Sequence, residues 1–479
     1  MPELILAIDV GTTSARAGVF GADATRRSMA RAGLVSRSPA PGRVEQDADA
    51  VWRAVKGVIR RALIDAGCSG RDLAAVGLTT QRASAVVWDR RSGRALSPLV
   101  IWSDLRGVER AAQLMNAGHF IAPQQSAAKL EAIIGEIADA DALRAQGRLA
   151  WGNIDSFLIW KLSGGAAHVT DRGQAWPSGY LNLLDLNWNP ALIELQGLDP
   201  AMFPRLADTW GPLAYTTATV FGAAVPIASD IADQQSALMA HGLGAGIAKV
   251  TFGTAAVANL ATAGLSLAGL PGIPPLIVSS VGDQTAYCLE AMVLSAGSAI
   301  DWLRGACGLG AHGPFEALAA SVADAGGAAF LPTLQGLGAP QPDPTRRATL
   351  SGLTGAVSRA NLARAGLEGV AFRVREAVDG LIALNAADAP KTLGADGGLT
   401  ANNTFMQIQA DLMSRPIRRH AAREATLAGA ALGAGLGAGV LKSADVAAFA
   451  RYDRTFTPSI SADEAENRYA AWRAAVHPA

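Results

Sequence analysis

The sequence predicts an α/β protein of two large domains, and three observations support this prediction. Its 479 residues exceed what one hydrophobic core usually organises, since domains typically hold about 100–200 residues. Short apolar strands alternate with amphipathic helices, the pattern of α/β proteins. A strand–turn–strand unit with a Gly-Thr turn occurs near residues 5–20 and again near 248–261, which suggests a duplicated domain. We expect domains at residues 1–241 and 242–479 that pack closely over a cleft.

The first half begins with a predicted hairpin. Residues 3–9 form a buried strand, and a polar turn joins them to a second strand at residues 16–20. Residues 47–66 are expected to be a helix because apolar side chains recur there at helical spacing, and Asp47 or Asp49 can cap its start. The other expected elements of this half are strands at 73–78, 85–88 and 225–229, a helix at 152–162, and a polar turn at 230–235.

The second half continues the alternation of strands and helices. Strands are expected at 248–252, 256–261, 328–331, 348–350 and 392–395, and helices at 283–306, 360–386, 401–413 and 426–440. The Ala- and Gly-rich run from Leu427 to Leu441 falls short of the ~18–20 residues that span a bilayer. We expect it to be a tightly packed core helix.

Charge and cysteine content exclude several classes of protein. The chain has 41 basic and 41 acidic residues, so no basic excess indicates nucleic acid or an anionic membrane as partner. Cys68, Cys288 and Cys307 are far apart and form no CxxC pair, which predicts reduced thiols without a disulfide framework or zinc site. The first residues lack the basic and apolar regions of a signal peptide, so a cytoplasmic location is expected.

The first motif with chemical potential is Asp-Val-Gly-Thr-Thr-Ser at residues 9–14. A glycine turn between strands lets backbone N–H groups approach a phosphate, and the hydroxyls add donors. The carboxylate of Asp9 can hold a metal ion directly or through water, and Arg16 adds positive charge nearby. An ordinary hairpin turn is the alternative interpretation.

A second motif, at residues 229–235, places Asp233 at the end of a strand. A carboxylate there can face a cleft and act as a general base toward a substrate hydroxyl. The alternative is a helix N-cap, a role that suits aspartate.

A third motif, at residues 394–403, has Gly397 and Gly398 after a strand and before a helix. Such a turn allows a nucleotide to approach the backbone, and the alternative is a tight turn with an Asn-rich helix start. Other signatures are absent from the sequence: there is no GxxxxGK[ST] P-loop, no Rossmann glycine pattern after a strand, and no GxSxG nucleophile motif.

Taken in order, these motifs resemble those of the FGGY carbohydrate kinases, particularly their glycerol-kinase-like branch. The resemblance spans nearly the whole chain. The matching stretches are residues 7–16, 41–47, 77–82, 100–104, 168–171, 233–235, 252–254, 336–340, 343–344, 351–354, 396–398 and 401–403.

The resemblance implies two actin-like (ribonuclease H-like) domains of the sugar kinase, actin and chaperone superfamily, with ATP in the cleft between them. It implies Asp233 as the catalytic base and Asp9 as the residue that helps hold Mg²⁺. The residues implied at the phosphates and nucleotide are Thr12, Thr13, Ser14, Arg16, Thr254, Gly297, Gly398 and Asn402. Those implied at the acceptor, a small sugar or polyol, are Arg82, Trp102, Asp233 and Gln234.

The sequence also departs from the glycerol-kinase pattern around the acceptor. Ala83 stands where those kinases have Glu, and Ala122 and Val257 fall at their Tyr and Phe in an ungapped placement. Lys129 is followed by Leu130, Glu131 and Ala132 rather than by the usual aromatic and Trp. We therefore expect an ATP-dependent kinase for a ketose or polyol larger than glycerol.

Three alternatives stay open at this stage. They are a glycerol kinase proper, an actin-like ATPase that assembles or acts as a chaperone, and a kinase-derived binding or regulatory protein without turnover. A homodimer is one oligomeric state that the sequence allows. The sequence does not determine the sugar, the hydroxyl that is phosphorylated or any regulator.

Overall fold

The computed structural model describes residues 3–269 and 272–476, which form two compact units. Unit 1 runs through Ala240 and adds Ile277–Thr285 and Thr426–Phe449. Unit 2 holds His241–Leu276, Ala286–Ala425 and the segment from Ala450. The chain therefore passes between the units several times, and part of its last quarter completes unit 1. The division into functional domains at residues 241 and 242 stays a prediction.

Unit 1 is built on a six-stranded sheet in the order β14-β15-β6-β1-β2-β3. The three central strands β15, β6 and β1 are parallel, and the pairs that flank them are antiparallel. The bounds are β1 Leu4–Val10, β2 Ser14–Phe20, β3 Arg26–Gly33, β6 Leu73–Thr80, β14 Trp210–Tyr215 and β15 Pro226–Ala232. The hairpin predicted at residues 3–20 is confirmed as β1 and β2.

Unit 2 repeats this arrangement. Reading β24-β23-β22-β16-β17-β19 gives the same order of parallel and antiparallel pairs as β14-β15-β6-β1-β2-β3 in unit 1. The bounds are β16 Ala248–Phe252, β17 Ala256–Thr262, β19 Gln284–Val293, β22 Leu393–Asp396, β23 Ile417–His420 and β24 Tyr452–Phe456, with β18 Pro275–Val281 before β19 in the chain. The two Gly-Thr hairpins seen in the sequence occupy equivalent places in the two sheets.

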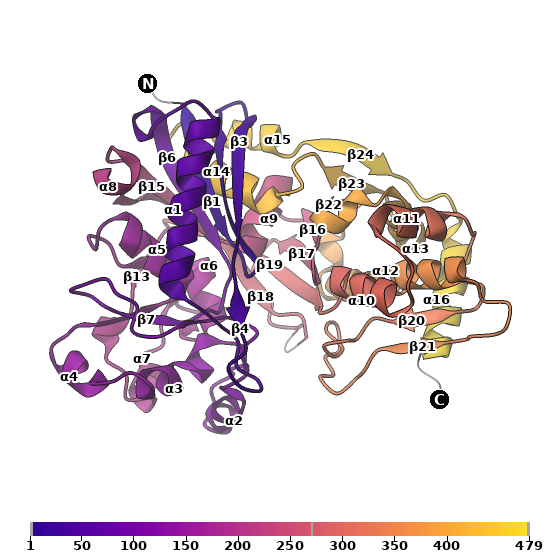
Figure 1. The fold of residues 1–479 in the computed structure, drawn as a ribbon, viewed down its shortest axis with the longest axis horizontal. Coiled ribbons are helices and arrows are strands. Elements are labelled where there is room, and N and C mark those ends of the chain that lie inside the picture. Colours follow the sequence, from indigo (N-terminus) through magenta and orange to yellow (C-terminus); the bar gives the residue numbers. More distant parts are fainter. Residues whose placement is uncertain (1–2, 270–271, 477–479) are drawn as a thin grey trace. The chain divides into compact units, whose positions relative to one another are not determined.

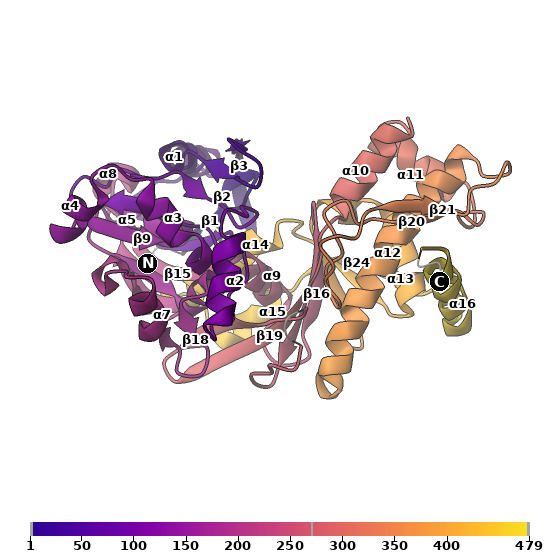
Figure 2. The same cartoon turned by 90° about the horizontal axis from the view of Figure 1, so that it is seen from below.

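Helices cover both faces of the unit 1 sheet. Helix α1 (Ala48–Asp65) lies on one face and α14 (Ala425–Gly437) on the other (Figures 1 and 2). Asp47 caps α1 by accepting a hydrogen bond from the N–H of Ala50 at 2.9 Å, as expected. Other helices of this part are α2 Val108–Asn116, α3 Leu130–Gly135, α4 Ala140–Ala145, α5 Ile154–Leu162, α6 Arg172–Ala175, α7 Pro190–Leu195, α8 Ala218–Phe221, α9 Asp233–His241 and α15 Val446–Phe449. Shorter strands are β4 Ser36–Arg37, β5 Glu45–Gln46, β7 Val86–Asp89, β8 Leu99–Val100, β9 Leu149–Gly152, β10 Val169–Asp171, β11 Leu181–Asn182, β12 Asn187–Trp188 and β13 Arg205–Ala207.

In unit 2, the long helix α12 (Arg359–Leu384) packs beside α13 (Asn403–Met413) and carries much of the buried apolar surface (Figure 2). Ser358 caps α12 and forms a capping box with Asn361. The other elements are α10 Gly297–Ala306, α11 His312–Ala320, α16 Ala462–Val476, β20 Ala329–Leu331 and β21 Thr349–Ser351.

Two sequence predictions are wrong in their bounds. The helix expected at residues 283–306 is a strand, β19, followed only from Gly297 by helix α10. The polar turn expected at residues 230–235 does not exist, because β15 continues to Ala232 and α9 begins at Asp233. Strand β19 pairs with β18 and β17, and its residues 288–291 are buried in succession; this pairing and burial outweigh the helix-forming tendency of its Ala, Leu, Glu and Met residues.

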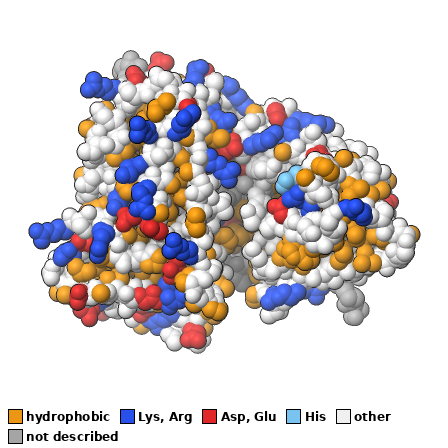
Figure 3. All heavy atoms as spheres, in the orientation of Figure 1, with side chains coloured by type: hydrophobic (Ala, Val, Ile, Leu, Met, Phe, Trp, Pro, Cys, Tyr) orange, Lys and Arg blue, Asp and Glu red, His pale blue; other side chains and the backbone are white. Residues whose placement is uncertain are grey.

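On the face shown in Figure 3, basic and acidic side chains are interspersed over unit 1.

Within residues 3–269 and 272–476, no helix is both long and apolar enough to cross a membrane. Cys68, Cys288 and Cys307 are free thiols.

Helix α14 approaches the unit 1 sheet unusually closely. A Cβ added at Gly77 of β6 would lie 2.2 Å from the carbonyl oxygen of Ala430, and one at Gly433 would lie 2.5 Å from the side chain of Ile231. Ser229 Oγ donates a hydrogen bond to the Ala430 carbonyl at 3.2 Å. The small residues at 427–441 therefore permit tight packing, and the core helix expected there is confirmed.

We predict that Gly77→Ala destabilises the protein by about 1–3 kcal/mol, because the new methyl group overlaps the Ala430 backbone, which cannot move without shifting α14. Thermal denaturation measures the effect as a lower melting temperature. The matched control is Gly57→Ala inside α1, where an added Cβ meets nothing within 4 Å, and which should stabilise by about 0.5–1 kcal/mol. Equal stability of Gly77→Ala and wild type would contradict the close packing.

Candidate active site

The parallel strands of unit 1 end at one edge of the sheet, where the predicted site residues gather. Val10, Thr80 and Ala232 are the last residues of β1, β6 and β15, and they lie side by side in register. The residues that follow these strands therefore emerge together: the Gly-Thr turn after β1, Arg82 after β6, and Asp233 after β15. Ligands of open α/β sheets bind at this carboxyl edge.

The turn at residues 11–13 is held from several sides. The Gly11 N–H donates to the Ser14 carbonyl at 3.1 Å, and the Leu34 N–H donates to the Thr13 carbonyl at 2.9 Å. The buried side-chain amide of Gln46 donates to the Thr12 carbonyl at 2.6 Å. Thr13 is exposed, whereas Ser14 begins β2 and is buried. A fixed turn of this kind can present donors to a phosphate without reorganising.

Asp9 is buried near the end of β1, and two partners orient its carboxylate. Its Oδ2 accepts from Arg16 Nη1 at 2.9 Å and from Thr426 Oγ1 at 2.9 Å. The predicted neighbours Asp9 and Arg16 are thus in direct contact. Thr426 comes from the distant segment that begins α14, and nothing in the local sequence around it indicates this role.

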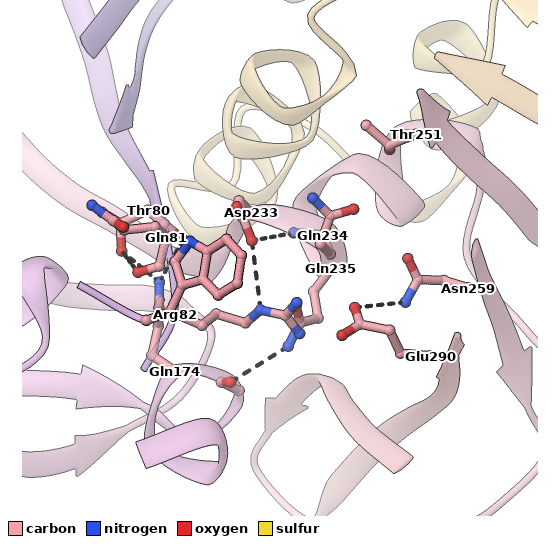
Figure 4. A network of polar contacts seen from close by, with 12 residues as sticks. Thr80, Gln81, Arg82, Gln174, Asp233, Gln234, Gln235, Thr251, Asn259 and Glu290 are labelled. Carbon is pink, nitrogen blue, oxygen red and sulfur yellow. Dashed lines mark hydrogen bonds and ion pairs between the residues drawn. The ribbon is translucent and has the colours of Figure 1, made fainter. Parts of the chain in front are cut away.

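Arg82 and Asp233 form the central ion pair of the edge. Arg82 Nε lies 3.5 Å from Asp233 Oδ1, and the two side chains point toward one another (Figure 4). The same carboxylate oxygen accepts the Gln234 N–H at 2.8 Å. Asp233 is the first residue of α9, but its side chain is 24% exposed and paired with Arg82, so it is held at the edge.

Trp102 joins the acceptor residues to the phosphate turn. Its indole Nε1 donates to Thr12 Oγ1 at 3.0 Å, and Thr12 Oγ1 donates in turn to Gln81 Oε1 at 3.2 Å. The structure therefore brings together Thr12 and Trp102, which the sequence analysis assigned to different ligands. Gln81 was not singled out, although its place directly before Arg82 at a strand end could have indicated it.

Behind the edge, Gln174 supports the end of β6. Its Nε2 donates to Thr80 Oγ1 at 2.8 Å (Figure 4). The backbone N–H of Gln174 donates to the carboxylate of Asp171, which caps α6. This carboxylate also accepts a hydrogen bond from Thr209 Oγ1 at 2.9 Å. Gln174 was missed from the sequence because no local pattern marks a glutamine that bonds to a strand almost a hundred residues earlier.

Three fully buried carboxyl groups lie beside this support. Asp230 Oδ2 accepts the Asp171 N–H at 3.1 Å, and Asp155 accepts from Thr170 Oγ1 at 2.6 Å. Burial, together with the neighbouring acids, raises the pKa of Asp171 to about 7 and that of Asp230 well above its usual value. Burial also raises the pKa of Asp155. The folded protein therefore keeps protons here that the unfolded chain releases.

We predict that this cluster makes stability fall as pH rises. Raised pKa values stabilise the fold fully below the unfolded value of 3.8, and this stability is lost as pH rises through the folded values, such as about 7 for Asp171. Asp230→Asn removes one titrating group, so melting temperatures at about pH 5.5 and about pH 8.5 should differ less than in wild type. Asp141→Asn, at a side chain that is 97% exposed, should leave the wild-type difference unchanged. A pH profile of Asp230→Asn parallel to wild type would show that Asp230 does not titrate in this way.

The carboxyl edge of the unit 2 sheet carries a second group of predicted residues. Thr254 lies in the turn between β16 and β17, and Gly297 begins α10. The Gly297 N–H donates to the Gly253 carbonyl at 3.0 Å, and a Cβ at Gly297 would lie 2.6 Å from that oxygen. The structure thus brings Thr254 and Gly297 together and requires glycine at position 297.

The glycine turn after β22 lies at the same edge, because β22 is parallel to β16. Gly397 has φ of 91°, and a Cβ there would lie 2.5 Å from the Phe252 carbonyl, so only glycine fits. Gly398 is exposed with open space around its Cα. Asn402 caps α13 by accepting the Phe405 N–H at 2.8 Å, which confirms the helix-start interpretation for its side-chain oxygen.

Asp396 is the last residue of β22, and its side-chain bonds fix the strand end that leads into the turn at Gly397 and Gly398. It accepts from His241 Nε2 at 3.0 Å and from Thr251 Oγ1 at 2.8 Å, and Thr251 in turn accepts from Lys249 Nζ at 2.7 Å. Burial opposes ionisation, but the His241 bond and the Lys249 charge hold the pKa of Asp396 below its usual value. A buried charged network therefore fixes the strand that leads into Gly397 and Gly398.

Comparison with known proteins agrees with this arrangement. Residues 4–240 match the N-terminal domain of the FGGY family of carbohydrate kinases, and residues 248–438 match its C-terminal domain. A glycerol kinase of Dechloromonas aromatica is 36% identical over 487 aligned residues, which cover 99% of this chain and 97% of that protein. A glycerol kinase of Aromatoleum aromaticum is 37% identical, with 99% and 98% covered.

The chain belongs to the FGGY family of carbohydrate kinases. It is therefore a phosphotransferase with an alcohol group as acceptor. Membership in this family outweighs the alternative of an actin-like assembly ATPase, which has no use for an acceptor site.

Solved structures of FGGY kinases confirm the fold class of two actin-like domains. A glycerol kinase of Plasmodium falciparum with ADP superposes with a TM-score of 0.89 at 23% identity, covering 98% of this chain and 97% of that one. A xylulose kinase of Rhodospirillum rubrum gives a TM-score of 0.83 at 26% identity, with 98% of each chain covered.

Proposed function

We propose that the protein transfers the γ-phosphoryl group of ATP to a hydroxyl of a small sugar or polyol, with Asp233 as general base. The observation that carries this proposal is the ion pair of Arg82 and Asp233 at the carboxyl edge of unit 1. It lies beside the turn that contains Thr12 and Thr13. A base, a cation and a phosphate-type turn at one edge are the groups that phosphoryl transfer to an alcohol requires.

In the proposed reaction, Asp233 accepts the proton of the acceptor hydroxyl as its oxygen bonds to phosphorus. An ionised carboxylate both pairs with a guanidinium and accepts a proton, so Arg82 orients the base in its working form. The backbone N–H groups of Thr12 and Thr13 and the exposed Thr13 hydroxyl would donate to the phosphate oxygens, while the Thr12 hydroxyl stays bonded to Gln81 and the buried Ser14 supports the turn. Arg16 would add positive charge beside Asp9. Gln234, held next to Asp233, and Trp102 would bind other parts of the acceptor.

We assign the nucleotide to the residues at the unit 2 edge: Thr254, Gly297, Gly398 and Asn402. The exposed Gly398 and the tight turn at Gly397 leave backbone open for close approach. Kinases of this family are expected to use ATP, and Mg²⁺ would neutralise charge on its phosphates.

Asp9 fits the role of a protein carboxylate near Mg²⁺. Among residues 3–269 and 272–476, no cluster of three or more His, Cys, Asp or Glu side chains could hold a metal alone. Mg²⁺ on ATP does not need such a cluster, since waters and phosphates supply most ligands beside one or two carboxylates. Asp9 lies two residues before the first residue of the turn at 11–13 and is held by Arg16 and Thr426.

For the acceptor, we propose a polyol or ketose larger than glycerol. Ala83 follows Arg82 directly, is buried, and adopts a left-handed conformation with φ of 52°. A methyl group there supplies neither the bulk nor the hydrogen-bond acceptor that a Glu would. Val257 lies buried on β17, and Ala122 is exposed in the loop before residue 126, so Ala83 carries most of the argument.

Glycerol is the second candidate acceptor. Relatives at 35–37% identity over 90–100% of this chain are glycerol kinases, and this resemblance favours a three-carbon acceptor. The two candidates differ in kcat/KM for glycerol against four- to seven-carbon polyols and ketoses, which a coupled ADP-release assay measures.

We predict that Asp233→Asn lowers kcat by roughly 10²–10⁴, because loss of a general base removes proton transfer while the shape of the site persists. Circular dichroism and a melting curve confirm that the variant folds. The control Asp65→Asn removes a carboxylate from an exposed pair with Arg61 on α1 and should keep wild-type turnover. Wild-type kcat in folded Asp233→Asn would rule out Asp233 as the base.

We predict that Ala83→Glu raises kcat/KM for glycerol by roughly tenfold, because a restored hydrogen bond to a substrate hydroxyl is worth about 1–3 kcal/mol in a closed site. Ala83→Met, of similar length without a polar atom, should give no such gain. Activity of the wild type on longer acceptors should exceed that on glycerol. A wild-type preference for glycerol would support the second candidate and overturn the larger acceptor.

A further inference from the structure

One buried cation in unit 1 has no part in the proposed chemistry. The side chain of Lys129, between residues 126–128 and α3, is fully buried. In the described residues it forms no ion pair with a carboxylate, because the nearby Asp104 is bound by Arg106 at 2.9 Å. An unpaired ammonium is costly to bury, and an apolar side chain of the same length would suit this core better.

The hydrogen bonds of Lys129 show what it holds. Nζ donates to the carbonyl of Ile101 at 3.1 Å and to the carbonyl of Ala83 at 3.4 Å. Trp102 follows Ile101 in the chain, and Arg82 precedes Ala83. One amine thus bridges the two backbone segments that present the proposed acceptor residues.

The Lys129 amine joins the two segments just past their last backbone-paired residues. Ala85 and Val100 exchange both backbone hydrogen bonds, at 2.8 and 2.9 Å. Beyond that pair, toward Arg82 and Trp102, the Lys129 amine contacts both segments. Next to it, Ser126 Oγ donates to the Ser84 carbonyl at 2.9 Å, so the turn of residues 126–129 supports the Arg82 segment at two successive carbonyls.

Burial lowers the pKa of Lys129 to about 7, with the charge of Arg106 acting in the same direction and Asp104 opposing it. Both the ammonium and the neutral amine carry at least two hydrogens, so the two bonds can form in either state. The bridge therefore does not depend on the protonation of Lys129.

We propose that Lys129 is a positioning residue that sets the separation of Arg82 and Trp102 for the acceptor by holding the Ala83 and Ile101 carbonyls. This inference rests on the proposed roles of Arg82 and Trp102. Misplacing groups around a reacting hydroxyl by about 1 Å can cost on the order of 10²-fold in rate. Loss of the bridge should thus affect the acceptor more than the nucleotide.

The test compares Lys129→Met, which removes both donors, with Lys129→Gln, which keeps an amide donor. The acceptor is the best substrate from the ADP-release panel. We expect Lys129→Met to lower kcat/KM for the acceptor by roughly 10–100-fold, with KM for ATP within about twofold of wild type. Lys129→Gln should recover part of the loss. If Lys129→Met does not fold, Lys129→Gln carries the test through the same two KM values.

The matched control is Ile133→Ala, which removes a buried apolar side chain one helical turn after Lys129 and leaves the two Lys129 hydrogen bonds their donor. It should lower the melting temperature while both KM values stay at wild-type levels. A purely structural lysine would behave like this control. The proposal is overturned if a folded Lys129 variant keeps the wild-type KM and kcat for the acceptor, or if both KM values change equally.

Parallel assays of Arg82→Ala and Asp233→Asn separate the two hypotheses. If those variants keep wild-type activity, the proposed site itself is wrong. If they lose activity while Lys129→Met does not, only the positioning role of Lys129 fails.

Discussion

The register of three parallel strands is the constraint on which the unit 1 site depends. Val10, Thr80 and Ala232 end β1, β6 and β15 side by side, so three segments far apart in sequence emerge at one edge. A slip of one residue would turn every side chain of a strand to the other face. The close approach of α14 at Gly77 opposes such a slip in β6, because only glycine fits there.

Much of the fold could be predicted from the sequence because it is encoded locally. The hairpin at β1 and β2 and the helix after Asp47 follow from short apolar patterns and a capping residue. The error at β19 has the opposite origin. Residues 284–293 contain good helix formers, and pairing with β18 and β17 on either side makes them a strand.

The residues of the candidate site also fall into those that the sequence could predict and those that it could not. Asp9 and Asp233 could be named because each lies at the end of a predicted strand and carries a charge suited to phosphoryl transfer, and Arg82 because the family resemblance implies it. The residues that support the edge could not be named, since Gln46, Gln174 and Thr426 act on Thr12, Thr80 and Asp9 through contacts that no local pattern marks. The reactive side chains are thus easier to predict than the groups that orient them.

The return of the chain into unit 1 has a consequence for its biosynthesis. Residues through Ala240 contain Asp9, Arg82 and Asp233, yet the Thr426 hydroxyl on Asp9 and the helix over Gly77 come from the last quarter of the chain. The ribosome makes the protein from its N-terminus. The face of the unit 1 sheet that α14 covers therefore lacks this helix until residue 437 has been synthesised. Unit 1 is therefore complete only after most of unit 2 has been translated.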